Sequence, residues 1–393
     1  MYKEEDNTSH LITSNHAQPR DGKPLRVLCL DGGGMRGIYT AAYLNCLAKA
    51  FAKKRGVQAR LDIGTSFDLI CGTSTGAIIG CALALGIEPE QIVQLYRNNG
   101  AKIFPRKLPG ITGSKLKGLA SLAVDIFRRP AALASGELVL RTALEECFGD
   151  TSMGEVYASR KIALAIPAID IAHHRSWVFK TPHLIGTNHR DDKYKLVDVC
   201  LATSAAPLFR SLASIPNPDE LAGNSVFVDG GLWANNPVLV GLIDALKMAA
   251  PNQPIEIFCL GTCSLPAGED TAKIKLHRGL WDWKFGGEAA GLAIDAQMFA
   301  YTNMARMLCQ HVKNPCEIIQ FPSEQVPAAL MGYLGLDETS EAGALALIKQ
   351  ANSDANLANS RCNNPQDRQG QLVNKLFMEM SIQSPTNSGV ALN

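Results

Sequence analysis

The chain has 393 residues, of which 46% are hydrophobic and 19% are charged, with 38 Lys and Arg against 37 Asp and Glu. This composition supports a large buried core and excludes global disorder, and the length suits about two to three domains or one large domain with insertions. The net charge of +1 is not the electrostatic footprint of a protein that binds nucleic acid. We therefore expect a folded protein with no nucleic-acid polymer as partner.

The cysteines and the N-terminal residues indicate the cellular compartment in which the protein is expected. The cysteine count is eleven, an odd number, and several of these residues lie inside apolar runs: Cys29, Cys71, Cys81 and Cys259. This is typical of reduced thiols in a cytosol. Residues 1–24 form a flexible polar lead-in without the apolar segment of a secretory signal. The longest run of apolar residues and glycine, Gly76–Ile87, is shorter than the about 20 residues of a spanning helix. We expect a cytoplasmic protein.

Short apolar runs alternate with helical patterns along the first half of the chain. The spacing predicts strands at Arg26–Leu30, Phe67–Cys71, Lys161–Ile169 and Ser176–Lys180, and helices at Ile38–Lys54, from Gly76 to about Leu85, at Glu88–Ala101 and at Lys195–Ala205. Residues 105–136 differ, because prolines and glycines precede a helical pattern there. We interpret this segment as an insertion that forms a lid or contacts a membrane.

The second half continues the alternation. It predicts strands at Ser225–Val228, Ile255–Leu260 and Glu317–Phe321, a helix opened by Asn236-Pro237, and a long helix at Phe285–Val312. The pattern indicates an α/β fold with a mostly parallel central sheet. We expect a catalytic core over 25–265 and a helical, regulatory extension over 266–393, with a polar tail from about residue 351.

The sharpest motif is Gly72-Thr-Ser74-Thr-Gly76, a G-x-S-x-G placed between a predicted strand and a predicted helix. The two glycines allow a sharp, strained turn that exposes the hydroxyl of Ser74 above the sheet. The positive end of the following helix favours negative charge at this place. We interpret Ser74 as a nucleophile, against the alternative of a serine that caps a helix.

A second motif, Asp31-Gly32-Gly33-Gly34-Met35-Arg36-Gly37, follows the first strand. Its glycines match the dinucleotide fingerprint G-x-G-x-x-G. Against that interpretation, Asp31 would repel a pyrophosphate, and no clear acidic residue closes a second strand. We favour an oxyanion hole, in which the backbone N–H groups of Gly32, Gly33 and Gly34 converge on a developing negative charge. Arg36 adds positive charge or fixes the loop.

The third motif, Asp229-Gly230-Gly231, closes a predicted strand and places a carboxylate at the edge where Ser74 is expected. A catalytic triad in the chain order Ser, Asp, His would need a histidine after Asp229. Only His277 and His311 follow Asp229, and neither lies at the end of a predicted strand. The sequence therefore favours a Ser74–Asp229 dyad without histidine. We find no metal-ligand spacing and no P-loop, and expect neither a metal nor a cofactor.

In this order the three motifs resemble those of the patatin-like phospholipases, whose pattern is D-G-G-G-x-[RK]-G, then G-x-S-x-G, then D-G-[GA]. The similarity spans about residues 25–265. It implies a three-layer α/β fold related to the catalytic domain of cytosolic phospholipase A2. It also implies hydrolysis of lipid acyl esters by a Ser–Asp dyad without cofactors. Carried over, Ser74 is the nucleophile, Asp229 the base, and Gly32–Gly34 with Arg36 the oxyanion loop.

The apparent compartment resembles that of bacterial members of the family, some of which are effectors of anti-phage signalling activated by a cyclic dinucleotide. The resemblance implies a membrane phospholipid substrate, peripheral contact with the inner face of the membrane, and leaves a homo-oligomer open. A basic amphipathic pattern suits that contact, with apolar Leu116, Leu119, Leu122, Ala123, Ile126 and Phe127 flanked by Lys115, Lys117, Arg128 and Arg129. The alternatives are an ordinary core helix there, and a non-lipid esterase or acyltransferase with the same dyad.

Overall fold

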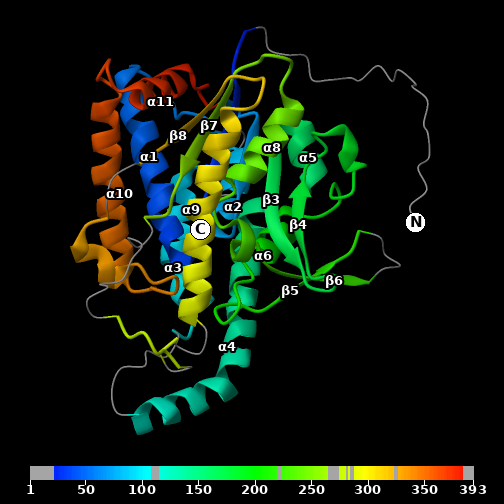
Figure 1. Cartoon of the computed structure of the whole chain (residues 1–393), viewed down its shortest axis with the longest axis vertical. Coiled ribbons are helices and arrows are strands. Elements are labelled where there is room, and N and C mark those ends of the chain that lie inside the picture. The colour runs from blue at the N-terminus through cyan, green and yellow to red at the C-terminus, as the bar shows by residue number, and fades with distance from the viewer. Residues whose placement is uncertain are drawn as a thin grey trace.

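A central sheet lies between two layers of helices (Figure 1). The computed structural model describes residues 22–107, 115–218, 223–263, 274–279, 282–283, 287–322 and 326–383. Within these residues the sheet has eight strands, and β5-β6-β3-β2-β1-β7-β8 is its order, with β4 paired to β3. The predicted α/β class and three-layer arrangement are confirmed. The expected lead-in falls almost entirely on residues 1–21, outside the described residues.

Five neighbouring strands are parallel. They are β3 (Ala163–Asp170), β2 (Leu69–Gly72), β1 (Leu25–Leu30), β7 (Ile255–Leu260) and β8 (Cys316–Gln320). All six residues of β1 are buried. Leu28 and Leu30 pack into the core on one face of the sheet, and Val27 and Cys29 into the core on the other. A strand covered on both faces needs this continuous apolar run.

The antiparallel strands bring two distant motifs together. These strands are β4 (Arg175–Lys180), β5 (Ala213–Pro216) and β6 (Asn224–Asp229). β4 pairs with one edge of β3 over Ala165–Asp170, so β2 and β6 both pair with its other edge. On that edge Cys71 lies opposite Ala165, and Asp229 lies opposite Ala168. β2 runs parallel to β3 and β6 antiparallel, so their C-terminal ends point toward each other. The turn after β2 therefore meets the end of β6.

Helices cover both faces. The larger layer contains α1 (Gly37–Lys54), α2 (Thr75–Leu85), α3 (Pro89–Ile103), α4 (Lys115–Phe148), α5 (Met153–Arg160), α6 (Leu196–Thr203), α10 (Glu341–Arg361) and α11 (Arg368–Glu379). The other layer contains α7 (Gly231–Ala234), α8 (Val238–Met248) and α9 (Gly287–Cys309). α8 begins at Val238, directly after the predicted Asn236-Pro237 start, and the Asn236 side chain accepts a hydrogen bond from the backbone N–H of Val238.

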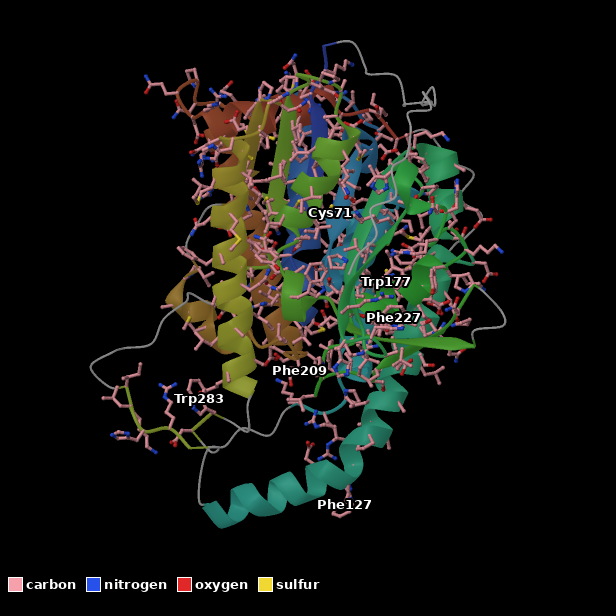
Figure 2. All side chains as sticks on the ribbon, turned by 45° about the vertical axis from the view of Figure 1, so that its right-hand side comes forward. Cys71, Phe127, Trp177, Phe209, Phe227 and Trp283 are labelled. Carbon is pink, nitrogen blue, oxygen red and sulfur yellow. The ribbon has the colours of Figure 1, made fainter. Side chains whose placement is uncertain are left out.

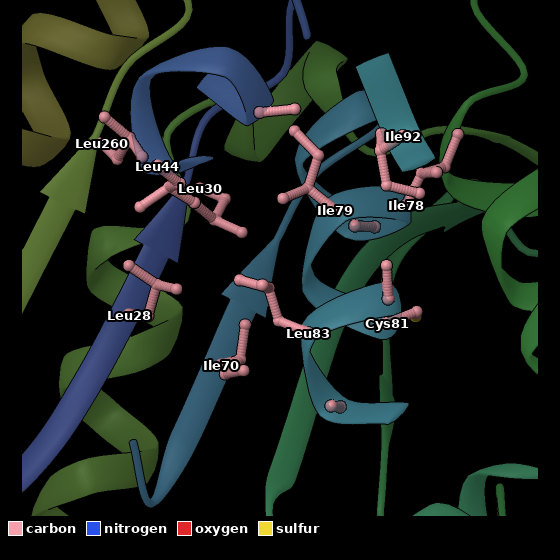
Figure 3. Close-up of a cluster of buried hydrophobic side chains, with 14 of the residues drawn as sticks. Leu28, Leu30, Leu44, Ile70, Ile78, Ile79, Cys81, Leu83, Ile92 and Leu260 are labelled. Atoms are coloured by element: carbon pink, nitrogen blue, oxygen red, sulfur yellow. The ribbon is translucent and has the colours of Figure 1, made fainter. Parts of the chain in front are cut away.

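The contact between the sheet and α2 fixes the turn that precedes this helix. Leu28, Leu30 and Ile70 lie on the face of β1 and β2 that meets Ile79 and Leu83 of α2 (Figure 3). Each side chain is at most 2% exposed. Burying such a side chain contributes about 1.5–3 kcal/mol, so α2 is held firmly against the C-terminal ends of the central strands.

The C-terminal region differs from the expected polar tail. Residues from 351 on continue α10 and form α11, so the predicted tail was wrong over the described residues. The buried face of α10 consists largely of alanines at helical spacing, Ala351, Ala355 and Ala358, which give a weak apolar signal in the sequence. The expected boundary at residue 265 is likewise no break in the sheet, because β8 pairs with β7.

Phe377 provides a test that α11 belongs to the core. Its ring is fully buried and stacks on Phe51 of α1, with centroids 5.0 Å apart. We expect Phe377→Ala to lower the free energy of unfolding in urea by about 3–5 kcal/mol. Met378→Ala, at a side chain that is 41% exposed, is the matched control. A loss below about 1 kcal/mol for Phe377→Ala would contradict the packing.

The region 105–136 includes a long bent helix. α4 contains Pro130 and changes direction along its length (Figure 1), as expected for proline inside a helix. Phe127 is 85% exposed and points away from the body (Figure 2). Arg129, expected on the lipid side, is instead buried, and it bonds the Asp125 carboxylate and the Lys107 carbonyl. Its five N–H donors suit this network better than a surface role.

The remaining side chains of the predicted amphipathic pattern lie outside the described residues, apart from exposed Arg128. These are Lys115, Leu116, Lys117, Leu119, Leu122, Ala123 and Ile126. The same holds for residues 108–114, where the predicted insertion has much of its proline and glycine. Among the helices that the structure does describe, none is both long and apolar enough to cross a bilayer.

Candidate active site

The turn between β2 and α2 has the geometry of a nucleophile elbow. Ser74 has φ 54° and ψ −121°, a conformation that costs a non-glycine residue about 1–3 kcal/mol. A Cβ at Gly72 would lie 2.4 Å from the carbonyl oxygen of Gly76, and one at Gly76 would lie 2.3 Å from that of Leu30. Only glycine fits at either position. The predicted roles of Gly72 and Gly76 thus rest on close backbone approach, which keeps the turn sharp.

Two successive hydrogen bonds fix the backbone of Ser74. Its side chain stands at the N-terminus of α2, and the residue is 8% exposed. Its backbone N–H donates to the Thr203 hydroxyl at 3.0 Å, and that hydroxyl donates to the carbonyl of Pro167 at 2.6 Å. This relay ties the elbow to α6 and to β3. A nucleophile fixed in this way needs little reorganisation before it reacts.

Asp229, the last residue of β6, meets Ser74. Its carboxylate accepts a hydrogen bond from the backbone N–H of Gly231 at 2.6 Å. Burial raises the pKa of Asp229 to about 7, and the Gly231 N–H, the Ser74 side chain and the charge of Arg210 limit that rise. A carboxyl group with this pKa is a far better proton acceptor near neutral pH than an ordinary aspartate.

The glycine loop after β1 lies beside the elbow. The N–H of Gly32 donates to the backbone carbonyl of Asn235 at 2.9 Å. By contrast, the N–H groups of Gly33, Gly34 and Thr75 have no acceptor in the part of the chain that the structure describes. These three donors belong to the two turns around Ser74. They suit an oxyanion, whereas the N–H of Gly32 is already used and does not fit its expected role.

Two buried charges accompany the loop. Burial lowers the pKa of the Arg36 guanidinium, while Asp295 of α9, Cys263 and Asp31 oppose that change. Burial raises the pKa of Asp31 to about 8, against the charge of Arg36. Asp31 is therefore mostly protonated at pH 7 and does not supply the negative charge expected to repel a pyrophosphate. Arg36 carries the net positive charge of this loop.

The family model for patatin-like phospholipases matches residues 28–242, which include the second half of β1, the elbow and Asp229. The chain belongs to the patatin-like phospholipase family. The resemblance predicted from the three motifs is thereby confirmed, including membership of a family of hydrolases. The dinucleotide-binding interpretation of residues 32–37 finds no support, because the same loop is part of the patatin match.

Relatives of known name are similar over much of the chain. A "cGAMP-activated phospholipase" of Vibrio cholerae is 33% identical over 58% of this chain and 60% of its own length. One of Pseudomonas aeruginosa is 32% identical over 71% of this chain and 74% of its own length. One of Escherichia coli is 28% identical over 86% of this chain and 90% of its own length. The chain thus spans less than two thirds of the Vibrio relative.

The patatin motifs account for most of the predicted site, but several neighbours were missed. Thr203 and Arg210 lie on α6 and the turn after it, Asn235 after β6, and Asp295 on α9. Thr203, Arg210 and Asp295 lie outside the motifs, and Asn235 lies four residues after Gly231. The run Thr203–Pro207 at the end of the predicted helix Lys195–Ala205 was the one available signal, since small residues permit close backbone approach.

The described histidines and metal-ligating side chains lie outside the Ser74–Asp229 pair. Of the described histidines, His173 bonds Asp170, His183 bonds Asp244 and His189 bonds Asp192. None is hydrogen-bonded to Ser74 or Asp229 within the described chain. The same residues contain no group of three or more His, Cys, Asp or Glu side chains arranged to hold a metal ion. All eleven cysteines are free thiols.

Proposed function

We propose that this patatin-like protein hydrolyses fatty-acyl esters of membrane phospholipids, with Ser74 as nucleophile and Asp229 as general base. The observation that carries the proposal is the strand pairing that brings the C-terminal ends of β2 and β6 together, so that the Ser74 side chain acts on the Asp229 carboxylate. The raised pKa of Asp229, about 7, supports the same roles. A base with that pKa is half ionised at neutral pH and still accepts a proton readily.

The first half of the reaction forms an acyl-enzyme. The Asp229 carboxylate takes the hydroxyl proton as Oγ of Ser74 attacks the ester carbonyl. The carbonyl oxygen becomes an oxyanion, stabilised by the N–H groups of Gly33, Gly34 and Thr75. When the tetrahedral intermediate collapses, the C–O bond of the leaving group breaks, and the departing lysophospholipid alcohol takes the proton from Asp229.

The second half releases the fatty acid. Water attacks the acyl-enzyme while Asp229 accepts its proton, and a second oxyanion forms against the same N–H groups. Collapse breaks the bond to Ser74 Oγ, which regains the proton from Asp229. The buried positive charge of Arg36 favours both oxyanions through space, because charges interact strongly in a poorly solvated site.

We also propose that a cyclic dinucleotide activates the chain at the inner face of the membrane, in anti-phage defence. The support is the name shared by the three relatives, "cGAMP-activated phospholipase". The similarity to the Escherichia coli relative extends over 86% of this chain, beyond the family core. A soluble activator that favours the active state gives coupling of about 5- to 150-fold.

Fatty-acid release from mixed phospholipid vesicles tests both parts. The full chain, Ser74→Ala and Asp229→Asn are compared with and without a panel of cyclic dinucleotides that includes cGAMP. We expect release by the unmodified chain, about 5- to 150-fold stimulation by one member of the panel, and release at least about 10³-fold lower from either variant. Cleavage of small soluble esters without release from any vesicle would favour the esterase alternative and contradict the lipid substrate.

A further inference from the structure

A second buried arginine lies near the dyad without a partner. Arg210 follows α6 in the turn that leads to β5, and the residue is 6% exposed. Within the described residues, its Nε has no hydrogen-bond partner and its guanidinium makes no ion pair. An unpaired buried cation destabilises a fold. Such a group is retained where it meets an anion during function.

The turn that carries Arg210 follows a segment that lies against the dyad. The backbone N–H of Asp229 donates to the carbonyl of Ala205 at 3.1 Å, and that of Gly230 donates to the carbonyl of Thr203 at 3.2 Å. Burial lowers the pKa of Arg210 to about 10, and the charges of Glu137, Tyr96 and Asp229 oppose that change, Glu137 most and Asp229 least. The charge of Arg210 in turn lowers the pKa of Asp229. Arg210 and the dyad therefore share one buried region.

The turn that presents Arg210 is rigid. The backbone N–H groups of Phe209 and Arg210 both donate to the carbonyl of Ala206, at 3.1 and 2.8 Å. Leu208 has φ 72°, and its carbonyl accepts a hydrogen bond from buried Arg129 at 3.0 Å. Phe209 lies at the end of the sheet toward α4 (Figure 2). A strained turn fixed from α4 is consistent with a functional position for the side chain that it carries.

We propose that Arg210 binds the phosphate of the lipid headgroup, so that the site selects glycerophospholipids over neutral acylglycerols. This inference rests on the proposed function. In a glycerophospholipid the phosphate is attached to the glycerol carbon next to one that carries an acyl ester. When that ester lies at Ser74, the phosphate must therefore lie beside the dyad. A guanidinium binds phosphate through two parallel hydrogen bonds, a geometry that lysine does not offer.

Binding of short-chain lipids to the inactive Ser74→Ala chain tests the inference without hydrolysis. Titration calorimetry compares dihexanoylphosphatidylcholine with dihexanoylglycerol, in the presence and absence of cGAMP. We expect Arg210→Gln to weaken binding of the phospholipid about 10- to 100-fold and of the diacylglycerol by less than about threefold. Arg210→Lys is expected to give an intermediate loss. Arg368→Gln, at an exposed ion pair with Glu317, is the matched control.

The melting temperature separates headgroup binding from a structural role. Because removal of an unpaired buried charge relieves its cost, Arg210→Gln is expected to keep or raise the Tm. A fall of more than about 5 °C, with weaker binding of both lipids, would overturn the proposal and make Arg210 structural. Unchanged selectivity would overturn it as well. Failure of the Ser74→Ala chain to bind either lipid would instead count against the proposed lipid substrate itself.

Discussion

Replacing Ser74 with alanine is expected to lower fatty-acid release by about 10⁴-fold or more, because no acyl-enzyme can form without its Oγ. Asp229→Asn is expected to lower release by about 10³- to 10⁴-fold, because an amide cannot accept the hydroxyl proton. The two effects should not add, since both residues act in one proton transfer. Steady-state rates on phospholipid vesicles, at a fixed activator concentration, give the comparison.

Ser204→Ala and Asp198→Asn are matched controls for these variants. Ser204 is as buried as Ser74, and its hydroxyl donates to the carbonyl of Cys200. Asp198 is a buried carboxylate bonded to Arg141. Because neither belongs to the dyad, both controls should retain rates within about threefold of the unmodified chain. More than a tenth of the activity remaining in Ser74→Ala would exclude this nucleophile.

The pH profile is expected to rise through neutrality. Burial raises the pKa of Asp229 to about 7, and only the carboxylate accepts the proton from Ser74. The value of kcat/KM should therefore fall about tenfold for each pH unit below 7, to about 100-fold less at pH 5 than at pH 8. Initial rates between pH 5 and 9 measure it. A profile that is flat down to pH 5 would contradict an essential base with this pKa.

The same pKa predicts how stability changes with pH. The folded chain holds the Asp229 proton more tightly than the unfolded chain, whose pKa is near 3.8. Stability from this group is therefore present at low pH and lost as the pH rises from about 4 to about 7. Asp229→Asn avoids that loss, so its Tm should exceed that of the unmodified chain at pH 8 and approach it at pH 4.5. An equal difference at both pH values would count against the raised pKa.

Much of the site could be predicted from the sequence because its geometry is local. A serine between two glycines, after an apolar run and before a helix, specifies a sharp turn by steric exclusion alone. Gly72 and Gly76 show that exclusion directly, with no space for a Cβ at either position. The approach of Asp229 is not local. It depends on the antiparallel pairing of β6 with β3, which turns the end of β6 toward the end of β2, and the sequence gives no direct signal of that strand direction.

Features that depend on contacts between residues far apart in the chain could not be predicted from the sequence. The N–H of Gly32 is used by the carbonyl of Asn235, about two hundred positions away. Arg129 looked like a surface cation, yet it bonds backbone carbonyls from two other segments. The alanine face of α10 has little hydrophobic contrast, and its burial depends on α1. In each case a partner far along the chain decides the environment.

The most direct test of the dyad is covalent labelling with a long-chain alkyl fluorophosphonate, read by mass spectrometry of the intact chain and of its peptides. The reagent reports an activated serine without depending on the choice of lipid. We expect one adduct per chain, on Ser74, formed much more slowly in Asp229→Asn and absent in Ser74→Ala. An adduct on another residue, or equal labelling of Asp229→Asn, would contradict the account.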